Sequence, residues 1–377
     1  MKFSMIFEAQ LANPTRAREH QLLLDCVDQA LLAEEAGFDR VWAVEHHALK
    51  WYAHMSAPEI FLTWVAARTS RIRIGHGVVC MPFKYNHPMR VAERAAMLDT
   101  LSGGRLDLGA GRGGTDQELS LCGVDRDRTR EEVEEALRMI GRVWQSEEFE
   151  WHGLLDISPH PVIPRPVQEP HPPLFLACTK PETVTLAAEY GVGALILGFA
   201  GPDEVAHQRK MYDDAVEARR GDRLVSSIQN NHLSALCPTI VLDDGDEARR
   251  VGVRGQRFFQ ESISHWSRGG PPPAEDTEVD DNAAAIEQME SEKAQRISTG
   301  ELNVSTVRYS TNHAYGTATT AIEYVEALQQ AGADEIMCLV QMGTVPQEVC
   351  LETIRQWGRS VIPHFRGRTG ALKTRGT

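Results

Sequence analysis

The chain has 377 residues, of which 42% are hydrophobic and 24% are charged, and its formal net charge is −14. This composition is typical of a folded globular protein, and the length fits two small domains or one large α/β barrel of roughly 250 residues with insertions. The negative charge argues against a broad nucleic-acid surface, although one or two local cations would suffice for a small anionic cofactor.

The amino-terminal segment and the cysteines favour a cytoplasmic protein. MKFSMIFEAQ has no long apolar run behind Lys2, so we expect no signal peptide, and no window approaches the ~18 apolar residues of a membrane helix. The seven cysteines are odd in number and form no CxxC pair. We therefore predict a reducing compartment, no membrane association, and neither a disulfide framework nor a zinc knuckle.

Strand-like and helix-like segments alternate along the chain. The strand-like runs are Lys2–Phe7, Phe38–Val44, Arg71–Val79, Arg105–Ala110, Leu174–Ala177, Gly193–Leu197, Val225 to about Val241, and Glu335–Val340. The helix-like runs are Ala17–Ala36, Ala57–Thr69, Pro88–Leu101, Arg130–Gln145, Glu182–Tyr190, Asp203–Arg219, Ala318–Gln330 and Gln347–Val361. This alternation requires a parallel sheet, and eight units favour a closed (β/α)8 TIM barrel, whose chemistry lies at the carboxyl ends of the strands.

One long stretch, Ser262–Gly316, interrupts the alternation before the last strand–helix unit. It contains GGPPP, an acidic run and a helix-like piece, Ala283–Arg296. A connection of this length is normally functional or disordered, so we interpret it as a lid, with a solvated surface insertion as the alternative. Residues 1–365 would then form one barrel domain, and the polar, basic tail 366–377 is expected to be disordered.

Glu45, His46 and His47 follow the second strand, in the catalytic position of a parallel barrel. Strand alternation would send His46 one way and its two neighbours the other, so only one histidine would face the barrel mouth. That geometry weakens a metal site, and HExxH is absent from the sequence. A neutral imidazole suits general-base work, while a structural pair satisfied by hydrogen bonds is the alternative.

Glycines lie near the ends of the third and fourth strands. Gly75 and Gly77 indicate either a flat cofactor lying on the third strand or tight barrel packing. The fourth strand ends in GAGRGG, which contains GxGxxG, but we expect a loop over Thr115–Asp127 where the dinucleotide motif needs a helix. We therefore interpret Gly111 as room for a cofactor and Arg112 as a cation for its phosphate, with a solvated arginine as the alternative.

The segment after the fifth strand, CTKPET, begins a helix. The hydroxyls of Thr179 and Thr183, free backbone N–H groups and the helix dipole make this a natural phosphate site, and Lys180 adds charge. An ordinary helix N-cap with Pro181 at the first helical position explains the same residues, and both interpretations can hold together. Cys178 has no base partner in the sequence pattern.

Three motifs taken jointly resemble the bacterial luciferase-like flavin monooxygenases. They are GFDRVWAVEHH at 37–47, NHPMRVAE at 86–93 and LDTLSGGRL at 98–106, and the segments Tyr315–Thr317 and Gly332–Glu335 are similar too. The resemblance covers roughly residues 1–365 and indicates no particular substrate. It implies that a separate NAD(P)H:flavin reductase supplies reduced FMN. O2 would then form a flavin 4a-hydroperoxide that oxygenates a small organic substrate such as an aldehyde or ketone.

The resemblance also implies roles for single residues. His46, preceded by Glu45, corresponds to the histidine that supports the oxygenated flavin and acts as base. Gly77–Val78 falls where the family has a non-prolyl cis peptide beneath the flavin ring. Arg112 matches a phosphate-binding arginine, and the segment Thr179–Thr183 matches the phosphate loop, although it departs from the family's serine-rich version. A homodimer is a further expectation.

Three other functions stay open. Deazaflavin-dependent oxidoreductases of the same superfamily transfer hydride without oxygen, although their second strand more often ends in Asp-His than in Glu-His-His. A non-catalytic flavin-binding barrel would retain His46 as well. A nicotinamide dehydrogenase built on GAGRGG is the third alternative.

Overall fold

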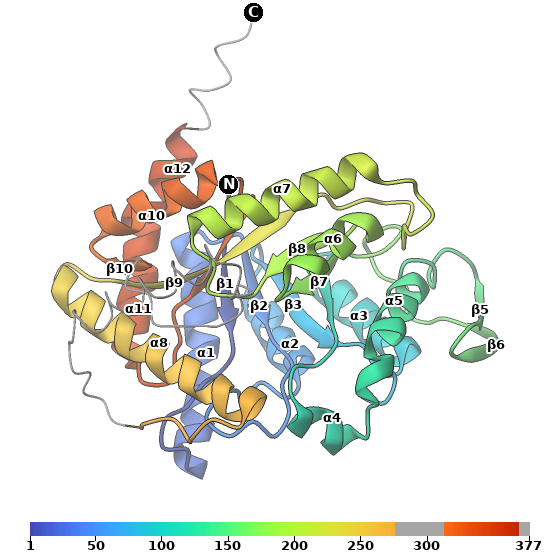
Figure 1. Cartoon of the computed structure of the whole chain (residues 1–377), viewed down its shortest axis with the longest axis horizontal. Coiled ribbons are helices and arrows are strands. Elements are labelled where there is room, and N and C mark those ends of the chain that lie inside the picture. Colours follow the sequence, from blue (N-terminus) through green and yellow to red (C-terminus); the bar gives the residue numbers. More distant parts are fainter. Residues whose placement is uncertain (276–312, 369–377) are drawn as a thin grey trace, which may run out of the picture.

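The computed structural model describes residues 1–275 and 313–368 and forms a closed parallel barrel (Figure 1). Around the barrel the strands are β1 (Lys2–Phe7), β2 (Arg40–Ala43), β3 (Arg73–Cys80), β4 (Leu106–Gly111), β7 (Leu174–Cys178), β8 (Gly193–Ile196), β9 (Leu233–Val241) and β11 (Glu335–Leu339). The barrel closes because β11 pairs in parallel with β1, and β8 with β9. The predicted (β/α)8 barrel is therefore confirmed.

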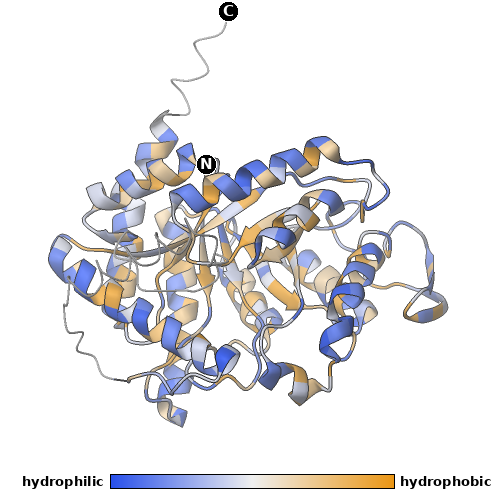
Figure 2. Ribbon diagram, viewed as in Figure 1, coloured by the Kyte–Doolittle hydropathy of each residue, from blue (hydrophilic) through white to orange (hydrophobic). Residues whose placement is uncertain are grey.

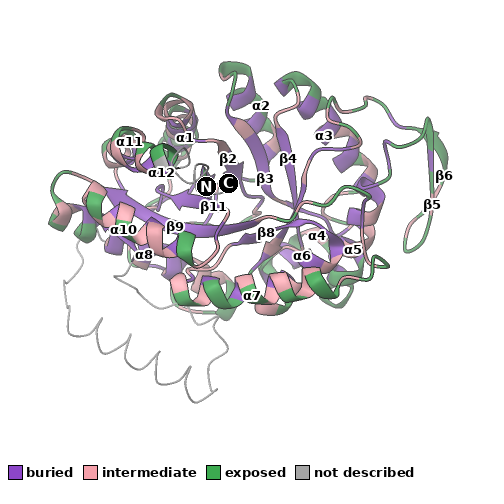
Figure 3. Ribbon diagram, turned by 90° about the horizontal axis from the view of Figure 1, so that it is seen from above, coloured by how far each residue is buried: buried purple, intermediate pink, exposed green. Residues whose placement is uncertain are grey.

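Helices surround the strands and turn their polar faces outward (Figures 2 and 3). They are α1 (Arg16–Ala36), α2 (Pro58–Arg68), α3 (Pro88–Ser102), α5 (Thr129–Ile140), α6 (Pro181–Tyr190), α7 (Pro202–Ala218), α8 (Gly245–Arg268), α10 (Ala318–Gln330) and α11 (Gln347–Gln356). No described helix has the length and apolar character needed to cross a membrane. All seven cysteines lie in the described part of the chain, and all are unpaired.

The loop predicted over Thr115–Asp127 is wrong, because the short helix α4 (Asp116–Cys122) lies within it. The Thr115 hydroxyl accepts a hydrogen bond from the Glu118 backbone at 3.2 Å, and the Glu118 carboxylate accepts one from the Thr115 backbone at 3.1 Å. This is a capping box, and its T-x-x-E signature was present in the sequence. The intervening loop therefore gives no reason to set the GxGxxG motif aside.

Three other segments differ from the predicted boundaries. An antiparallel hairpin of β5 (Glu148–His152) and β6 (Asp156–Pro161) extends from the barrel after α5, where the sequence analysis assigned no strand (Figure 1). The last predicted helix ends at Gln356 and continues as a π-helical segment, Trp357–Val361. The strand expected from Val225 begins only at Leu233.

The predicted insertion Ser262–Gly316 overlaps regular elements at both ends. Helix α8 continues through Ser262 to Arg268, and β10 (Ala314–Gly316) pairs in parallel with β9. The helix-like piece Ala283–Arg296 lies outside the described residues. At the carboxyl end, α12 (Ile362–Arg368) includes the first residues of the tail that was expected to be disordered, and residues 369–377 lie outside the described part.

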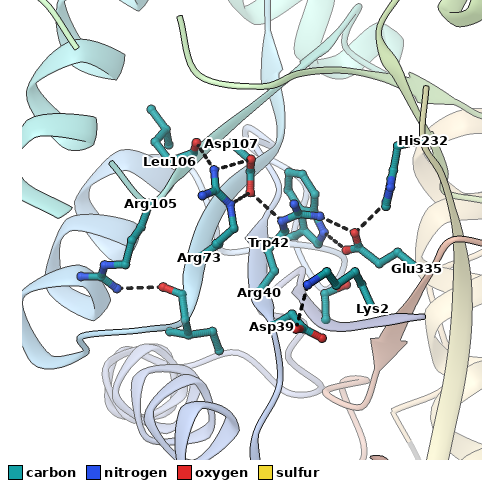
Figure 4. Close-up of polar contacts among 12 residues, drawn as sticks. Lys2, Asp39, Arg40, Trp42, Arg73, Arg105, Leu106, Asp107, His232 and Glu335 are labelled. Carbon is teal, nitrogen blue, oxygen red and sulfur yellow. Dashed lines mark hydrogen bonds and ion pairs between the residues drawn. The ribbon is translucent and has the colours of Figure 1, made fainter. Parts of the chain in front are cut away.

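The amino-terminal end of the barrel is closed by buried ion pairs (Figure 4). Arg40, at the start of β2, contacts Asp107 on β4 through Nε at 2.6 Å and also pairs with Glu335 on β11. Arg73 makes two hydrogen bonds to Asp107, at 2.7 and 2.8 Å. Asp107 and Glu335 are fully buried, so each carboxylate depends on these partners to offset its lost hydration.

We call this cluster of Arg40, Arg73, Asp107 and Glu335 the floor of the barrel. Trp42 fills the barrel interior next to it. Its indole Nε1 donates to Glu335 at 2.8 Å, and its ring packs edge-to-face on Phe175 with centroids 5.1 Å apart. A Cβ atom at Gly75 would lie 2.2 Å from the Trp42 ring, and one at Gly77 would lie 3.0 Å from its Cβ atom. The two glycines of β3 therefore make room for an indole, which supports the tight-packing alternative for these residues.

Replacing Glu335 by Gln is expected to lower the free energy of unfolding by about 3 kcal/mol, because it removes a counter-charge from the buried Arg40. Burial alone would raise the pKa of Glu335, but Arg40 and His232 hold it below its ordinary value of 4.5. Such a carboxylate stabilises the fold above that ordinary pKa, and the stabilisation is lost as the pH falls. The difference between the urea midpoints of wild type and variant should therefore shrink in acid.

The matched control is Glu147→Gln, on an exposed residue far from the floor. It should change the free energy of unfolding by less than about 0.5 kcal/mol. Equal midpoints for wild type and Glu335→Gln near neutral pH would contradict the role assigned to the floor.

Candidate active site

Acidic and imidazole side chains meet at the carboxyl end of the barrel. Glu8 directly follows β1, His46 follows β2, and Glu118 lies on α4 after β4. The His46 Nδ1 atom is 2.8 Å from Glu118 Oε1, and its Nε2 atom is 3.8 Å from Glu8 Oε2. Segments that follow three different strands thus bring two carboxylates to the two ring nitrogens of His46.

The carboxylates around His46 favour the charged form of its imidazole. Burial alone would lower the pKa of His46, but the hydrogen bond and charge of Glu118, with further contributions from Glu8 and Glu45, raise it overall. Burial would likewise raise the pKa of Glu118, yet His46 and backbone donors lower it to about 2. The hydrogen bond between them therefore favours an imidazolium at His46 and a carboxylate at Glu118.

Glu45 supports the loops around His46. Its Oε2 atom accepts a hydrogen bond from the Cys80 backbone at 2.7 Å, and its Oε1 atom contacts Asn86 Nδ2 at 2.9 Å and His47 Nε2 at 3.0 Å. Burial would raise the pKa of Glu45, but these contacts lower it. The carboxylate predicted as catalytic is thus fully engaged in joining the ends of β2 and β3.

The side chains of His46 and His47 have separate partners, but the strand alternation on which the sequence prediction rested does not apply to them. Strand β2 ends at Ala43, so His46 and His47 lie beyond the strand and alternation does not orient them. The hydrogen bonds do so instead: His46 turns to Glu118, whereas the His47 ring turns to Glu45 and only its backbone N–H reaches Glu118, at 3.1 Å.

Two tyrosines complete the surroundings of the histidines and were missed by the sequence reasoning. Tyr52 packs edge-to-face on His46 with centroids 5.1 Å apart and hydrogen-bonds Glu8. Tyr85 stacks on His47 at 5.9 Å, and its buried hydroxyl has no hydrogen-bond partner among the described residues. Tyr85 lies in the loop between β3 and α3. Glu8 directly follows β1, and the rule that barrel sites lie at the carboxyl ends of strands could have identified it from the sequence.

Positive charge gathers beside the end of β4. Arg112 is half-buried and forms no hydrogen bond or close ion pair with the described residues. Burial, and then the neighbouring Arg130 and Arg126, lower the pKa of Arg112, while Glu182 at the start of α6 opposes them. A half-buried cation with cationic neighbours and little counter-charge is suited to binding an anion.

The beginning of α6 lies on the same side of the barrel. Thr179 and Lys180 are exposed, whereas Thr183 is buried and its hydroxyl donates to the Lys180 carbonyl at 2.6 Å. Thr183 therefore caps the helix, which leaves Thr179, Lys180 and the free N–H groups of the first turn available to a ligand. Burial raises the pKa of Cys178 to about 12, so its thiolate is disfavoured and a nucleophilic role is unsupported.

The peptide bond between Gly77 and Val78 is cis. The Val78 side chain lies against β4, where a Cβ atom at Gly109 would be 2.8 Å from it and one at Gly111 would be 2.4 Å from it. The space beside Gly111, which the sequence suggested for a cofactor, is thus occupied by Val78. No group of three or more metal-ligating side chains occurs within residues 1–275 and 313–368.

Comparison with known proteins identifies the family. The family model for luciferase-like monooxygenases matches residues 1–335. The chain belongs to this family. Membership makes the protein an oxidoreductase of the luciferase-like class and confirms the resemblance seen in its sequence motifs.

Relatives within the family differ in their cofactors. This luciferase-like chain is 25% identical to the oxygenase component of a flavin-dependent trigonelline monooxygenase from Acinetobacter baylyi, over 91% of this chain and 90% of that protein. It is 31% identical to 4-hydroxyprotoasukamycin monooxygenase from Streptomyces nodosus subsp. asukaensis, over 64% of each protein. An F420-dependent glucose-6-phosphate dehydrogenase from Kineococcus radiotolerans is 34% identical over 47% of this chain and 53% of that protein.

Solved structures share the fold across the whole chain. The monooxygenase RslO1 from Streptomyces bottropensis has a TM-score of 0.77 and 24% identity, covering 97% of this chain and 100% of that one. The oxygenating constituent of 3,6-diketocamphane monooxygenase from Pseudomonas putida, in complex with FMN, has a TM-score of 0.72 and 17% identity, with coverages of 96% and 98%. At these identities the likeness concerns the fold alone.

Proposed function

We propose that this protein is an FMN-dependent monooxygenase that receives reduced FMN from a separate NAD(P)H:flavin reductase and uses O2 to oxygenate a small organic substrate such as an aldehyde or ketone. The observation that carries the proposal is His46, held between Glu118 and Glu8 at the mouth of a luciferase-like barrel. A relative that is itself an oxygenase component supports the two-component arrangement. We also propose a cytoplasmic location, because the seven unpaired cysteines of the described residues fit a reducing compartment.

The residues beside β4 and β7 fit the phosphate of FMN. Arg112 offers a half-buried guanidinium, and the start of α6 offers Thr179, Lys180 and free backbone N–H groups. We assign Thr183 a supporting role, because its hydroxyl shapes this helix start. The dianionic phosphate would thus be bound where the otherwise acidic chain concentrates positive charge.

The flavin ring would lie over Gly77–Val78, with Gly111 behind Val78 on β4. Reduced FMN and O2 supply the oxygen-transfer chemistry when the cofactor is bound. The chain's own contribution is then to hold a proton on the imidazolium of His46 and to keep bulk water out. Tyr52, Phe259 and Phe199 support the second task, because they pack edge-to-face in succession at 5.3 and 5.1 Å beside His46.

Stopped-flow reoxidation tests the proposal directly. Reduced FMN bound to the protein and mixed with oxygenated buffer should return to the oxidised form through a resolved absorbance transient, more slowly than free reduced FMN. Replacing His46 by Ala should retain flavin binding but lower productive oxygenation by about 100-fold or more, because the proton donor is lost.

Other outcomes of this experiment distinguish the alternatives. Reoxidation as fast as that of free flavin, together with tight binding of reduced deazaflavin, would favour hydride transfer. This alternative is supported by the similarity to an F420-dependent dehydrogenase. Binding of FMN without turnover of any substrate would indicate a flavin-binding protein. Normal turnover by His46→Ala would contradict the role given to His46.

Replacing Arg112 by Ala should weaken FMN binding about 10- to 100-fold, because it removes a charge-assisted hydrogen bond to phosphate. Riboflavin, which lacks the phosphate, should bind wild type and variant equally well. Fluorescence titration measures both ligands. Arg142→Ala, on an exposed arginine near the β5–β6 hairpin, is the matched control and should bind FMN as wild type does. Unchanged FMN affinity in Arg112→Ala would remove Arg112 from the phosphate site.

We also propose that the protein is a homodimer joined through α2 and α3, which lie side by side (Figure 3). Both helices expose large apolar side chains at helical spacing: Ile60 and Trp64 on α2 are 67% and 52% exposed, and Met97 and Leu101 on α3 are 55% and 64% exposed. Large apolar side chains exposed on two neighbouring helices are typical of an association surface.

Trp64→Glu should convert the dimer to a monomer in sedimentation velocity, because it would bury an unpaired charge in the proposed interface. The control is Leu154→Glu, which changes an exposed apolar residue on the hairpin between β5 and β6 and should leave the mass unchanged. A monomeric wild type, or a dimeric Trp64→Glu variant, would refute this interface.

A further inference from the structure

Glu8 is a buried carboxyl group to which the proposed function gives a position beside His46 but no chemical role. Its side chain extends from the residue after β1 towards His46, and the residue is 8% exposed. Oε2 has no hydrogen-bond partner among the described residues, although it lies 3.8 Å from His46 Nε2. An unpartnered buried carboxylate oxygen is costly, so its position opposite the imidazole calls for an explanation.

The groups around this carboxyl group bear unequal charges. On the far side of the imidazole, Glu118 is ionised and hydrogen-bonds Nδ1, while Glu45 turns away to Cys80, Asn86 and His47. Tyr52 contributes a neutral hydroxyl that hydrogen-bonds Glu8. The single positive charge of His46 is therefore already balanced by Glu118, and a second carboxylate at Glu8 would add uncompensated negative charge.

These contacts make Glu8 a group that titrates in the neutral range. Burial raises the pKa of Glu8 to about 7, with the nearby Glu118 adding to the rise, and His46 and Tyr52 only partly oppose it. The imidazole and the carboxyl group lie 3.8 Å apart and shift each other's pKa: His46 lowers that of Glu8, and Glu8 raises that of His46. Groups that interact this closely titrate as a pair rather than singly.

We propose that Glu8 and His46 exchange a proton at His46 Nε2, with Glu118 fixing the imidazole through Nδ1, so that the three residues form one proton relay at the barrel mouth. The imidazolium would give its Nε2 proton to an oxygen atom of a bound ligand. The Glu8 carboxylic acid would then return a proton to Nε2 and become a carboxylate, which is reprotonated from solvent. No electrons move in these steps. Glu8 and Glu118 are thus positioning residues that act through His46.

The catalytic use of this relay rests on the proposed function, but the coupling itself belongs to the chain without flavin. The test is therefore made on flavin-free protein labelled with 15N-histidine, by imidazole 15N–1H correlation between about pH 5 and pH 9. The His46 signals are assigned by their loss in His46→Gln. In wild type they should move in two steps, one of which reports the ionisation of Glu8.

Glu8→Gln should leave a single His46 step, moved to lower pH by about one unit, because the isosteric amide removes a nearby negative charge. The control is Glu19→Gln: Glu19 Oε1 lies 3.7 Å from His54 Nε2 at a more exposed site and should not change the His46 titration. If Glu8→Gln and wild type titrate identically, the relay is refuted.

Tyr52→Phe gives a second measurement should Glu8→Gln fail to fold. Loss of the hydrogen bond to Glu8 should move the Glu8 step to higher pH while the other His46 step remains, and an unmoved step would refute the relay. In the loaded enzyme, Glu8→Gln should lose the pH dependence of kcat near neutrality and leave the KM for flavin unchanged. A coupled titration without oxygenation would overturn the proposed function alone, whereas oxygenation with an uncoupled titration would overturn the relay alone.

Discussion

The buried contacts of Arg40 are the constraint on which the rest of the barrel depends. Its guanidinium on β2 reaches Asp107 on β4 and Glu335 on β11, strands that do not neighbour β2 in the sheet. Backbone hydrogen bonds fix only adjacent strands, so this one side chain links strands across the interior. Because both carboxylates are fully buried, a shift in the register between strands would leave a buried charge without its partner.

Packing carries this constraint from the floor to the mouth. Glu335 holds the Trp42 indole, and the Trp42 ring occupies the space left by Gly75 and Gly77 on β3. The next residue, Val78, then fits against Gly109 and Gly111 on β4. Arg112 directly follows that contact. The proposed flavin site is thus positioned by a continuous series of close contacts, none of which leaves room for a larger side chain.

The sequence was sufficient for the parts of the fold that depend on local pattern. The alternation of apolar strands and amphipathic helices indicated the barrel, and left-handed glycines such as Gly37 and Gly103 ended helices where expected. The β5–β6 hairpin was not predictable in this way, because its strands carry mostly exposed residues without a clear apolar alternation. Helix α4 was predictable in principle, since Thr115 and Glu118 form its capping box.

The site was only partly predictable, for a physical reason. His46, Arg112 and the start of α6 were candidates from the sequence because each follows a barrel strand directly or matches a family motif. Glu118 was missed because nothing in the sequence shows that a short helix after β4 brings a carboxylate to a histidine after β2, 72 positions away. The roles of the glycines also depended on long-range contacts, since only the structure shows that Trp42 and Val78 occupy the space beside them.

Both ends of the barrel contain buried glutamates, and their neighbours decide what each one does. Glu335 at the floor faces Arg40 and His232, so the attraction of these groups outweighs burial and keeps the carboxylate charged. Glu8 at the mouth is next to Tyr52 and to His46, whose charge Glu118 already balances, so burial prevails and raises the pKa of Glu8 to about 7. The partners of Glu335 keep this carboxylate permanently charged, and the charge stabilises the fold. Glu8 lacks a partner whose charge is not already balanced, and we propose that it exchanges protons instead. The same side chain therefore contributes stability where the strands begin and, in the relay that we propose, proton exchange where they end.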